Sequence, residues 1–76
     1  MSRLPRLTGK GLVRVLKRFG FVERRIEGSH HILQKAFPDG TVTLPVPVHA
    51  GKIIKPGLLT HILRKARLSP DDLRDS

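Results

Sequence analysis

The chain has 76 residues, no cysteine, and 15 lysines and arginines against six aspartates and glutamates, which leaves a net charge of +9. Such an excess of positive charge predicts an anionic partner, and nucleic acid is the first candidate. The lack of cysteine excludes a disulfide framework, thiolate zinc sites and thiol catalysis. No apolar run approaches the roughly 20 residues of a membrane span and no signal peptide is recognisable, so we expect one cytoplasmic domain over residues 1–76.

The first predicted element is a helix from Gly9 to Phe19. Thr8 can cap its start, Gly20 can end it, and apolar residues recur between them at helical spacing. These apolar residues are Leu12, Val15, Leu16 and Phe19. The opposite face is basic, and we interpret it as an ordinary solvated face that adds to the positive field. Its members are Lys10, Arg14, Lys17 and Arg18.

Three strands are expected next, joined by two tight turns. Branched and apolar residues indicate strands over Phe21 to Ile26, His30 to Phe37, and Thr41 to Leu44. Gly28 can take the positive φ that the first turn needs, and Pro38-Asp39-Gly40 is a strong signal for the second. The three strands are therefore predicted to pair as antiparallel hairpins.

The segment from Pro45 to Val48 is expected to be an edge strand or an extended exit, because two of its four residues are prolines without an N–H. A loop then leads to a predicted helix from Pro56 to Arg67. Its apolar stripe is Leu59, Ile62, Leu63 and Ala66. Ser69 and Asp72 have the spacing of a capping box, which predicts a short C-terminal helix over about residues 69–74.

Two apolar helix stripes need a common surface to cover, and one face of the sheet supplies it. We therefore predict a small α+β domain of two layers, in the order α-β-β-β-α. The sheet has three antiparallel strands, and both helices lie on one of its faces. The other face and the loops at the edges are left for a partner.

Two adjacent histidines, His30 and His31, open the second predicted strand directly after the turn. Histidine exchanges protons near neutral pH. A side chain of this kind can act as a general base or a general acid. In an extended strand the two imidazoles point to opposite faces, so we expect them to have different roles.

Short motifs in a particular order connect these histidines to a known family. The motifs are Gly28-Ser29-His30-His31-Ile32, Pro38-Asp39-Gly40, Pro47-Val48-His49-Ala50-Gly51-Lys52, Lys55-Pro56-Gly57-Leu58-Leu59 and Ile62-Leu63. From about Lys10 to Leu68 the chain resembles the HicA toxins. The resemblance implies a double-stranded-RNA-binding-like fold, cleavage of mRNA that inhibits translation, and neutralisation by a HicB antitoxin that covers the active site.

The resemblance also implies site residues. The catalytic histidine of the family's Gly-Ser-His motif corresponds to His30, although some members carry it one position later, at the place of His31. We favour His30 as the general base and keep His31 as the alternative. The family's second histidine corresponds to His49, and a basic segment follows it. The expected RNA contacts are Ser29, His49, Lys52 and Lys55, while Gly28 has a structural role in the turn.

The leading prediction is therefore the toxin of a toxin–antitoxin pair, acting as a metal-independent mRNA endoribonuclease. No metal or cofactor is expected, because adjacent strand residues diverge and the nearby carboxylates lack ligand spacing. One alternative is a non-catalytic RNA-binding module of the same fold, which would still bind RNA after His30→Ala. Another is a basic interaction protein for an acidic partner.

Overall fold

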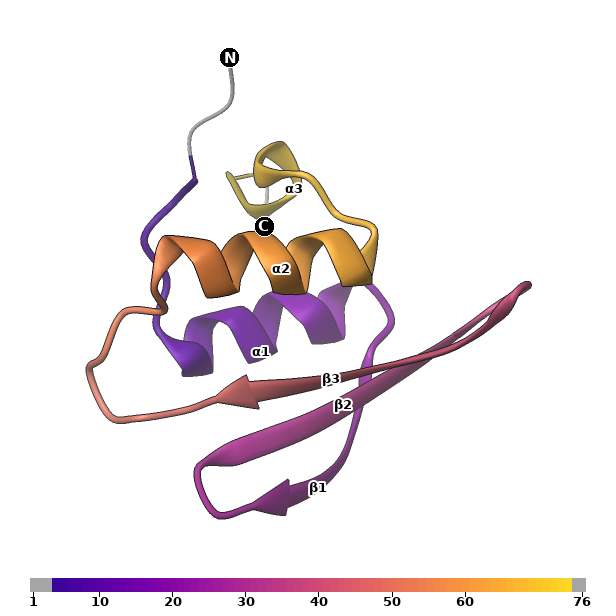
Figure 1. The fold of residues 1–76 in the computed structure, drawn as a ribbon, viewed down its shortest axis with the longest axis horizontal. Coiled ribbons are helices and arrows are strands. Elements are labelled where there is room, and N and C mark those ends of the chain that lie inside the picture. The colour runs from indigo at the N-terminus through magenta and orange to yellow at the C-terminus, as the bar shows by residue number, and fades with distance from the viewer. Residues whose placement is uncertain (1–3, 75–76) are drawn as a thin grey trace.

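Six elements follow one another in the predicted order in a computed structural model that describes residues 4–74 (Figure 1). They are α1 (Gly9–Arg18), β1 (Val22–Glu27), β2 (His30–Phe37), β3 (Gly40–Pro47), α2 (Pro56–Ala66) and α3 (Pro70–Arg74). The predicted α+β class is confirmed. Every boundary except the end of β3 lies within one residue of its prediction.

β3 is longer than predicted, because Pro45 and Pro47 lie inside it and not after it. The antiparallel sheet has the order β1-β2-β3, so β3 is an edge strand. The Val48 N–H donates to the Ser29 carbonyl at 2.7 Å, and by alternation positions 45 and 47 face the outer edge. A missing N–H at that edge removes no ladder bond, which explains why both prolines are tolerated.

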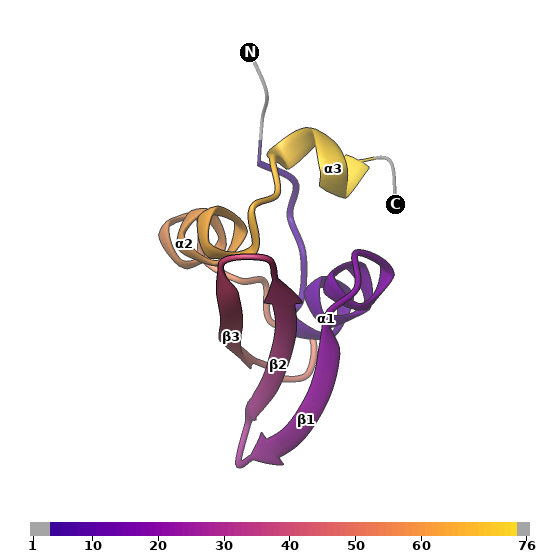
Figure 2. The ribbon, with the colours of Figure 1, turned by 90° about the vertical axis from the view of Figure 1, so that its right-hand side faces the viewer.

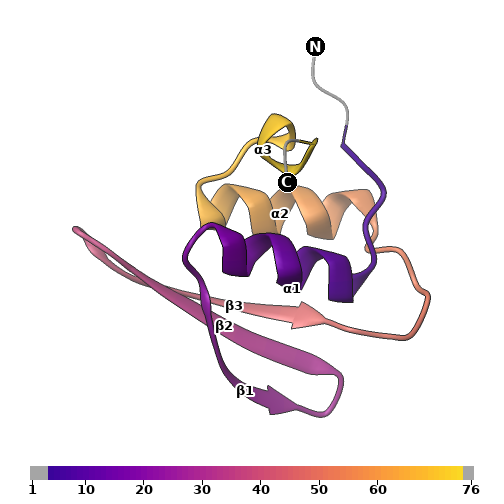
Figure 3. The ribbon, with the colours of Figure 1, turned by 180° about the vertical axis from the view of Figure 1, so that it is seen from behind.

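α1 and α2 lie side by side on one face of the sheet, as the two-layer prediction requires (Figures 2 and 3). The largest side chains that are fully shielded between these layers are Leu12, Leu16, Leu33, Leu44, Val46, Leu59 and Ile62. α3 lies on the far side of the two helices and buries Leu73 against the same core. Each buried leucine or isoleucine contributes about 1.5–3 kcal/mol, so this apolar contact holds the layers together.

The helix ends follow their sequence signals. Thr8 Oγ1 accepts a hydrogen bond from the Gly11 N–H at 3.1 Å and so caps α1. The Asp72 carboxylate accepts from the Ser69 N–H at 2.7 Å, which is half of the predicted capping box of α3. Arg67 ends α2 in the left-handed region, with a φ of 63°. Contacts between residues close in sequence thus mark where α1 and α3 begin.

The start of α1 lies directly against the end of β3. A Cβ on Gly9 would overlap the Pro47 carbonyl oxygen and lie 2.8 Å from Val48 Cα, so only glycine permits this approach. The Ile54 N–H also donates to the Leu7 carbonyl at 2.8 Å. The segment that leads into α1 is therefore bonded to the loop that follows β3.

Gly9→Ala is expected to destabilise the fold by about 1–3 kcal/mol, because the new methyl group has to displace the backbone of Pro47 and Val48. Gly57→Ala in α2 is the matched control, since a Cβ there meets nothing within 4 Å and alanine favours a helix. Urea unfolding followed by circular dichroism measures both variants. Equal stabilities would contradict the close approach of α1 to β3.

An exposed ion pair ties the β2–β3 turn to the end of α2. Arg67 Nη2 donates to Asp39 Oδ2 at 2.8 Å, and the guanidinium lies 4.1 Å from the centre of the Phe37 ring. The hydrogen bond from Arg67 is the main reason that the pKa of Asp39 is below its usual range. The turn is therefore more firmly attached when Asp39 is ionised.

The lowered pKa of Asp39 predicts a pH-dependent contribution to stability. A carboxylate of this kind adds stability above the pKa of the unfolded chain and loses it as the pH falls through the lower folded pKa. Asp39→Asn should therefore lower the free energy of unfolding at neutral pH, and its difference from wild type should shrink below about pH 4. Thermal unfolding across this range measures the difference. In an Arg67→Met background the pH-dependent effect of the same substitution should be smaller, because only the backbone hydrogen bond of Asp39 then lowers its pKa.

Candidate active site between α1 and the sheet

The turn before β2 delivers two histidines to the start of the strand. Gly28 has a φ of 60°, in the left-handed region that glycine reaches without strain. β2 and β3 then pair His30 with Pro47 and His31 with Val46. Val46 is buried in the core, so alternation puts the His31 side chain on the face under the helices and His30 on the open face.

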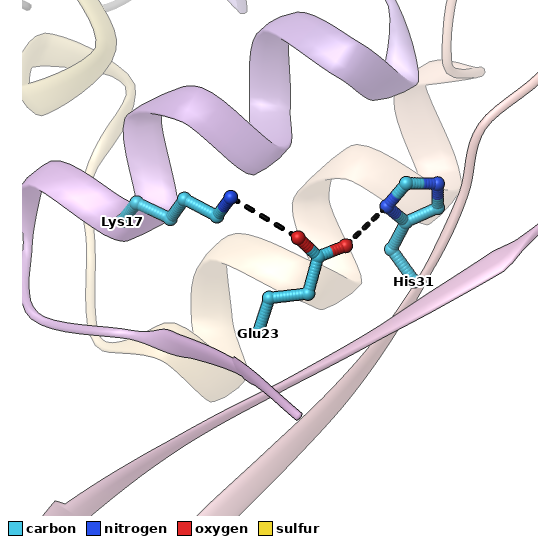
Figure 4. Close-up of polar contacts among 3 residues, drawn as sticks. All are labelled: Lys17, Glu23 and His31. Carbon is cyan, nitrogen blue, oxygen red and sulfur yellow. Dashed lines mark hydrogen bonds and ion pairs between the residues drawn. The ribbon is translucent and has the colours of Figure 1, made fainter. Parts of the chain in front are cut away.

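His31 contacts a carboxylate on β1 (Figure 4). Its Nδ1 is hydrogen-bonded to Glu23 Oε2, and Lys17 Nζ of α1 lies 3.1 Å from Glu23 Oε1. The side chains of His31 and Glu23 are only 25% and 23% exposed, so water screens their contact less than it screens a surface pair. One helix and two strands thus meet at one carboxylate.

Two neighbours keep Glu23 ionised. The hydrogen bond from Lys17 lowers the pKa of Glu23 most, and the hydrogen bond from His31 lowers it next. Partial burial acts in the opposite direction but does not outweigh them. The imidazole of His31 therefore has a negative charge beside it at neutral pH.

A hollow of about 270 Å³ opens beside His31, between α1 and the sheet. α1 contributes Lys10, Arg14 and Lys17 to its wall, at spacings that share one helix face. The sequence suggested only an ordinary solvated face here, whereas in the structure most of that face surrounds an imidazole. Three cations against the carboxylate of Glu23 leave the hollow positive, which suits a phosphate group.

The other predicted RNA contacts lie elsewhere. His49, Lys52 and Lys55 are exposed and line a second hollow together with apolar side chains, and this hollow shares no lining residue with the first. Ser29 is half-buried in the turn before β2. The structure therefore brings His31 to the basic face of α1 and does not bring His49 and the two lysines into that hollow.

Besides the apolar Val13, the side chains that line the first hollow carry one imidazole, one carboxylate and three cations. An imidazole can take and give a proton, and cations can stabilise a charged phosphate. Among residues 4–74 no cluster of three or more histidine, aspartate or glutamate side chains could hold a metal ion. In the same part of the chain, no helix has the length and apolar character to cross a membrane.

Sequence reasoning missed Glu23 as a site residue. His31 pairs with Ile26, so strict alternation along β1 would put Glu23 opposite Gln34, on the open face. A bulge just after Glu23 instead pairs it with Leu33, on the face of His31. No pattern in the sequence marks a bulge at this point, so only the strand pairing reveals the contact.

A known family matches most of the chain. Residues 9–68 match the model of a family described as the HicA toxin of bacterial toxin-antitoxin. The chain belongs to the HicA toxin family. No curated protein matches it. The family expected from the short motifs is thereby confirmed.

Membership of the HicA family makes this chain the toxin of a toxin–antitoxin pair and implies a HicB antitoxin as its partner. HicA toxins are known as mRNA interferases, which points in general to nuclease activity. The α-β-β-β-α order of this HicA chain is consistent with the expected double-stranded-RNA-binding-like fold.

If the hollow holds a phosphate of RNA, replacing one of its cations in this HicA chain should weaken RNA binding and flatten the salt dependence of binding. Lys10→Met and Arg14→Met should each lower the slope of log affinity against log salt by about one, because fewer counterions are released. Lys65→Met on α2 is the control, since Lys65 is exposed and lines neither hollow. Fluorescence anisotropy with a 2′-O-methyl RNA, which lacks the reacting hydroxyl, measures binding alone. Slopes equal to wild type in both variants would exclude the hollow as a phosphate site.

Proposed function

We propose that this chain is a metal-independent mRNA endoribonuclease that inhibits translation, with His31 as its general base. The observation that carries the proposal is the contact of His31 with Glu23 in a hollow lined by cations of α1. A base, a group that orients it and a positive surround are what RNA cleavage by the 2′-hydroxyl needs.

In the proposed reaction His31 takes the proton of a ribose 2′-hydroxyl. The 2′-oxygen attacks the adjacent phosphorus, the bond from phosphorus to the 5′-oxygen breaks, and that oxygen takes a proton from water. Lys10 and Arg14 stabilise the negative charge that gathers on the phosphate. The products are a 2′,3′-cyclic phosphate and a 5′-hydroxyl.

The geometry supports His31 more than His30, although the sequence favoured His30. His30 is exposed on the open face, and its side chain forms no hydrogen bond or ion pair within residues 4–74. The carboxylate nearest to it along the ladder, Glu27, is hydrogen-bonded to Arg25 instead. His30 thus lacks a group that would orient its ring, and it remains the alternative base in this proposal.

The remaining predicted residues extend the RNA surface in the proposal. Ser29, His49, Lys52 and Lys55 contact phosphates further along the strand, and they position the RNA without reading its sequence. Gly28 keeps its structural role in the turn. The proposed unit is a single HicA-like domain over residues 1–76 that needs no cofactor and acts in the cytoplasm, where mRNA is found.

A non-catalytic RNA-binding module is the second candidate, and the net charge of +9 is the observation that favours it. Such a module would use the same cations and would not need a histidine. The same charge also suits an acidic protein partner, so we expect the HicB antitoxin to be acidic where it covers the hollow.

Cleavage of a long unstructured RNA in excess EDTA tests the proposal, with each variant checked for folding by circular dichroism. His31→Ala should lose at least about 100-fold in rate, because a positioned acid–base group contributes 10²–10⁴-fold. His30→Ala should stay within a few-fold of wild type.

The other outcomes separate the alternatives. Loss of cleavage in His30→Ala alone would move the base to the open face of the sheet. Cleavage that survives both substitutions would direct the search to His49. Cleavage only after a metal is added would contradict metal independence, and binding without cleavage under either condition would favour the binding module.

A further inference from the structure

Glu23 is held at both carboxylate oxygens. Oε1 lies 3.1 Å from Lys17 Nζ, and Oε2 accepts a hydrogen bond from His31 Nδ1 (Figure 4). A carboxylate held from two sides cannot turn away from the imidazole without breaking one of these contacts. The position of Glu23 therefore restrains the ring of His31.

The same contact decides which ring nitrogen of His31 carries hydrogen. An ionised carboxylate only accepts hydrogen bonds, so Nδ1 has to be the donor. In the neutral imidazole the hydrogen then lies on Nδ1 and the free lone pair on Nε2. Figure 4 shows the second ring nitrogen pointing away from Glu23.

We propose that Glu23 is a positioning residue that holds His31 in the tautomer with hydrogen on Nδ1, so that Nε2 takes the proton of the ribose 2′-hydroxyl. This inference rests on the proposed ribonuclease function. A proton moves from the 2′-oxygen to Nε2, the 2′-oxygen uses its electron pair to bond phosphorus as the bond to the 5′-oxygen breaks, and the leaving 5′-oxygen takes a proton from water. The hydrogen on Nδ1 stays on His31, and the carboxylate stabilises the imidazolium that forms.

Among the residues that line the hollow, Glu23 is the one negative charge beside His31. α1 presents three cations and the apolar Val13 to the hollow, and β1 presents Glu23, while the buried Val46 of β3 is the ladder partner of His31. The imidazolium would have no counter-charge in the hollow without Glu23. Lys17 is engaged with Glu23, whereas Lys10 and Arg14 form no ion pair within residues 4–74 and are available to a phosphate.

Nitrogen NMR of isotopically labelled protein, recorded without RNA, tests the tautomer directly. Above the titration range of imidazole, wild-type His31 should show a protonated Nδ1 and an unprotonated Nε2. Glu23→Ala should shift His31 toward a mixture of the two tautomers. Glu27→Ala is the matched control and should not change the tautomer of His31, because Glu27 lies on the same strand but its carboxylate contacts Arg25.

Cleavage kinetics test the consequence for the reaction. Glu23→Gln, which keeps the shape of the side chain, should lower kcat about 10- to 100-fold with little change in KM, a part of what a positioned base contributes. Glu23→Asp should recover some of this loss, because it keeps a charged acceptor on the same side of the imidazole. If Glu23 had only a structural role, Glu23→Gln would lower the stability of the protein but would not lower kcat selectively at an unchanged KM.

Two results would overturn the inference. One is a wild-type His31 with hydrogen on Nε2, or a tautomer that Glu23→Ala leaves unchanged. The other is a Glu23→Gln variant that cleaves RNA at the wild-type rate. The expected tautomer in a folded wild-type protein that does not cut RNA would instead contradict the proposed function, so the two failures are distinguishable.

Discussion

The bulge after Glu23 is the feature on which the candidate site depends. It turns the Glu23 carboxylate from the open face of the sheet to the face under α1, where Lys17 and His31 both reach it. With strict alternation the imidazole would face three cations and no carboxylate. One extra residue in one strand therefore brings together an imidazole, a carboxylate and a set of cations.

The close packing of α1 on the sheet keeps these groups together. Leu12 and Leu16 are fully shielded beneath the helix, and Gly9 lets its first turn touch the backbone of Pro47. The opposite side of the same helix would be an ordinary solvated face on an isolated helix. It becomes the wall of a hollow because the strand that carries His31 lies next to it.

Local signals account for most of the fold. Thr8 caps α1, the turn at Gly28 joins β1 to β2, and Asp72 bonds back to Ser69 at the start of α3, because each contact involves residues close in sequence. Local sequence signals do not predict where β3 ends. Whether Pro45 can lie inside a strand depends on whether its missing N–H faces a neighbour or the outer edge.

The sequence by itself determined the α+β class, the order of the elements, the excess of positive charge and the family to which the motifs belong. These follow from composition and short-range patterns. Only the tertiary structure decided that His31 meets a carboxylate, that Glu23 shares its face, and that His49 lines a separate hollow. Those facts depend on the register between strands and on how a helix packs on a sheet. Such long-range contacts cannot be predicted from short stretches of sequence.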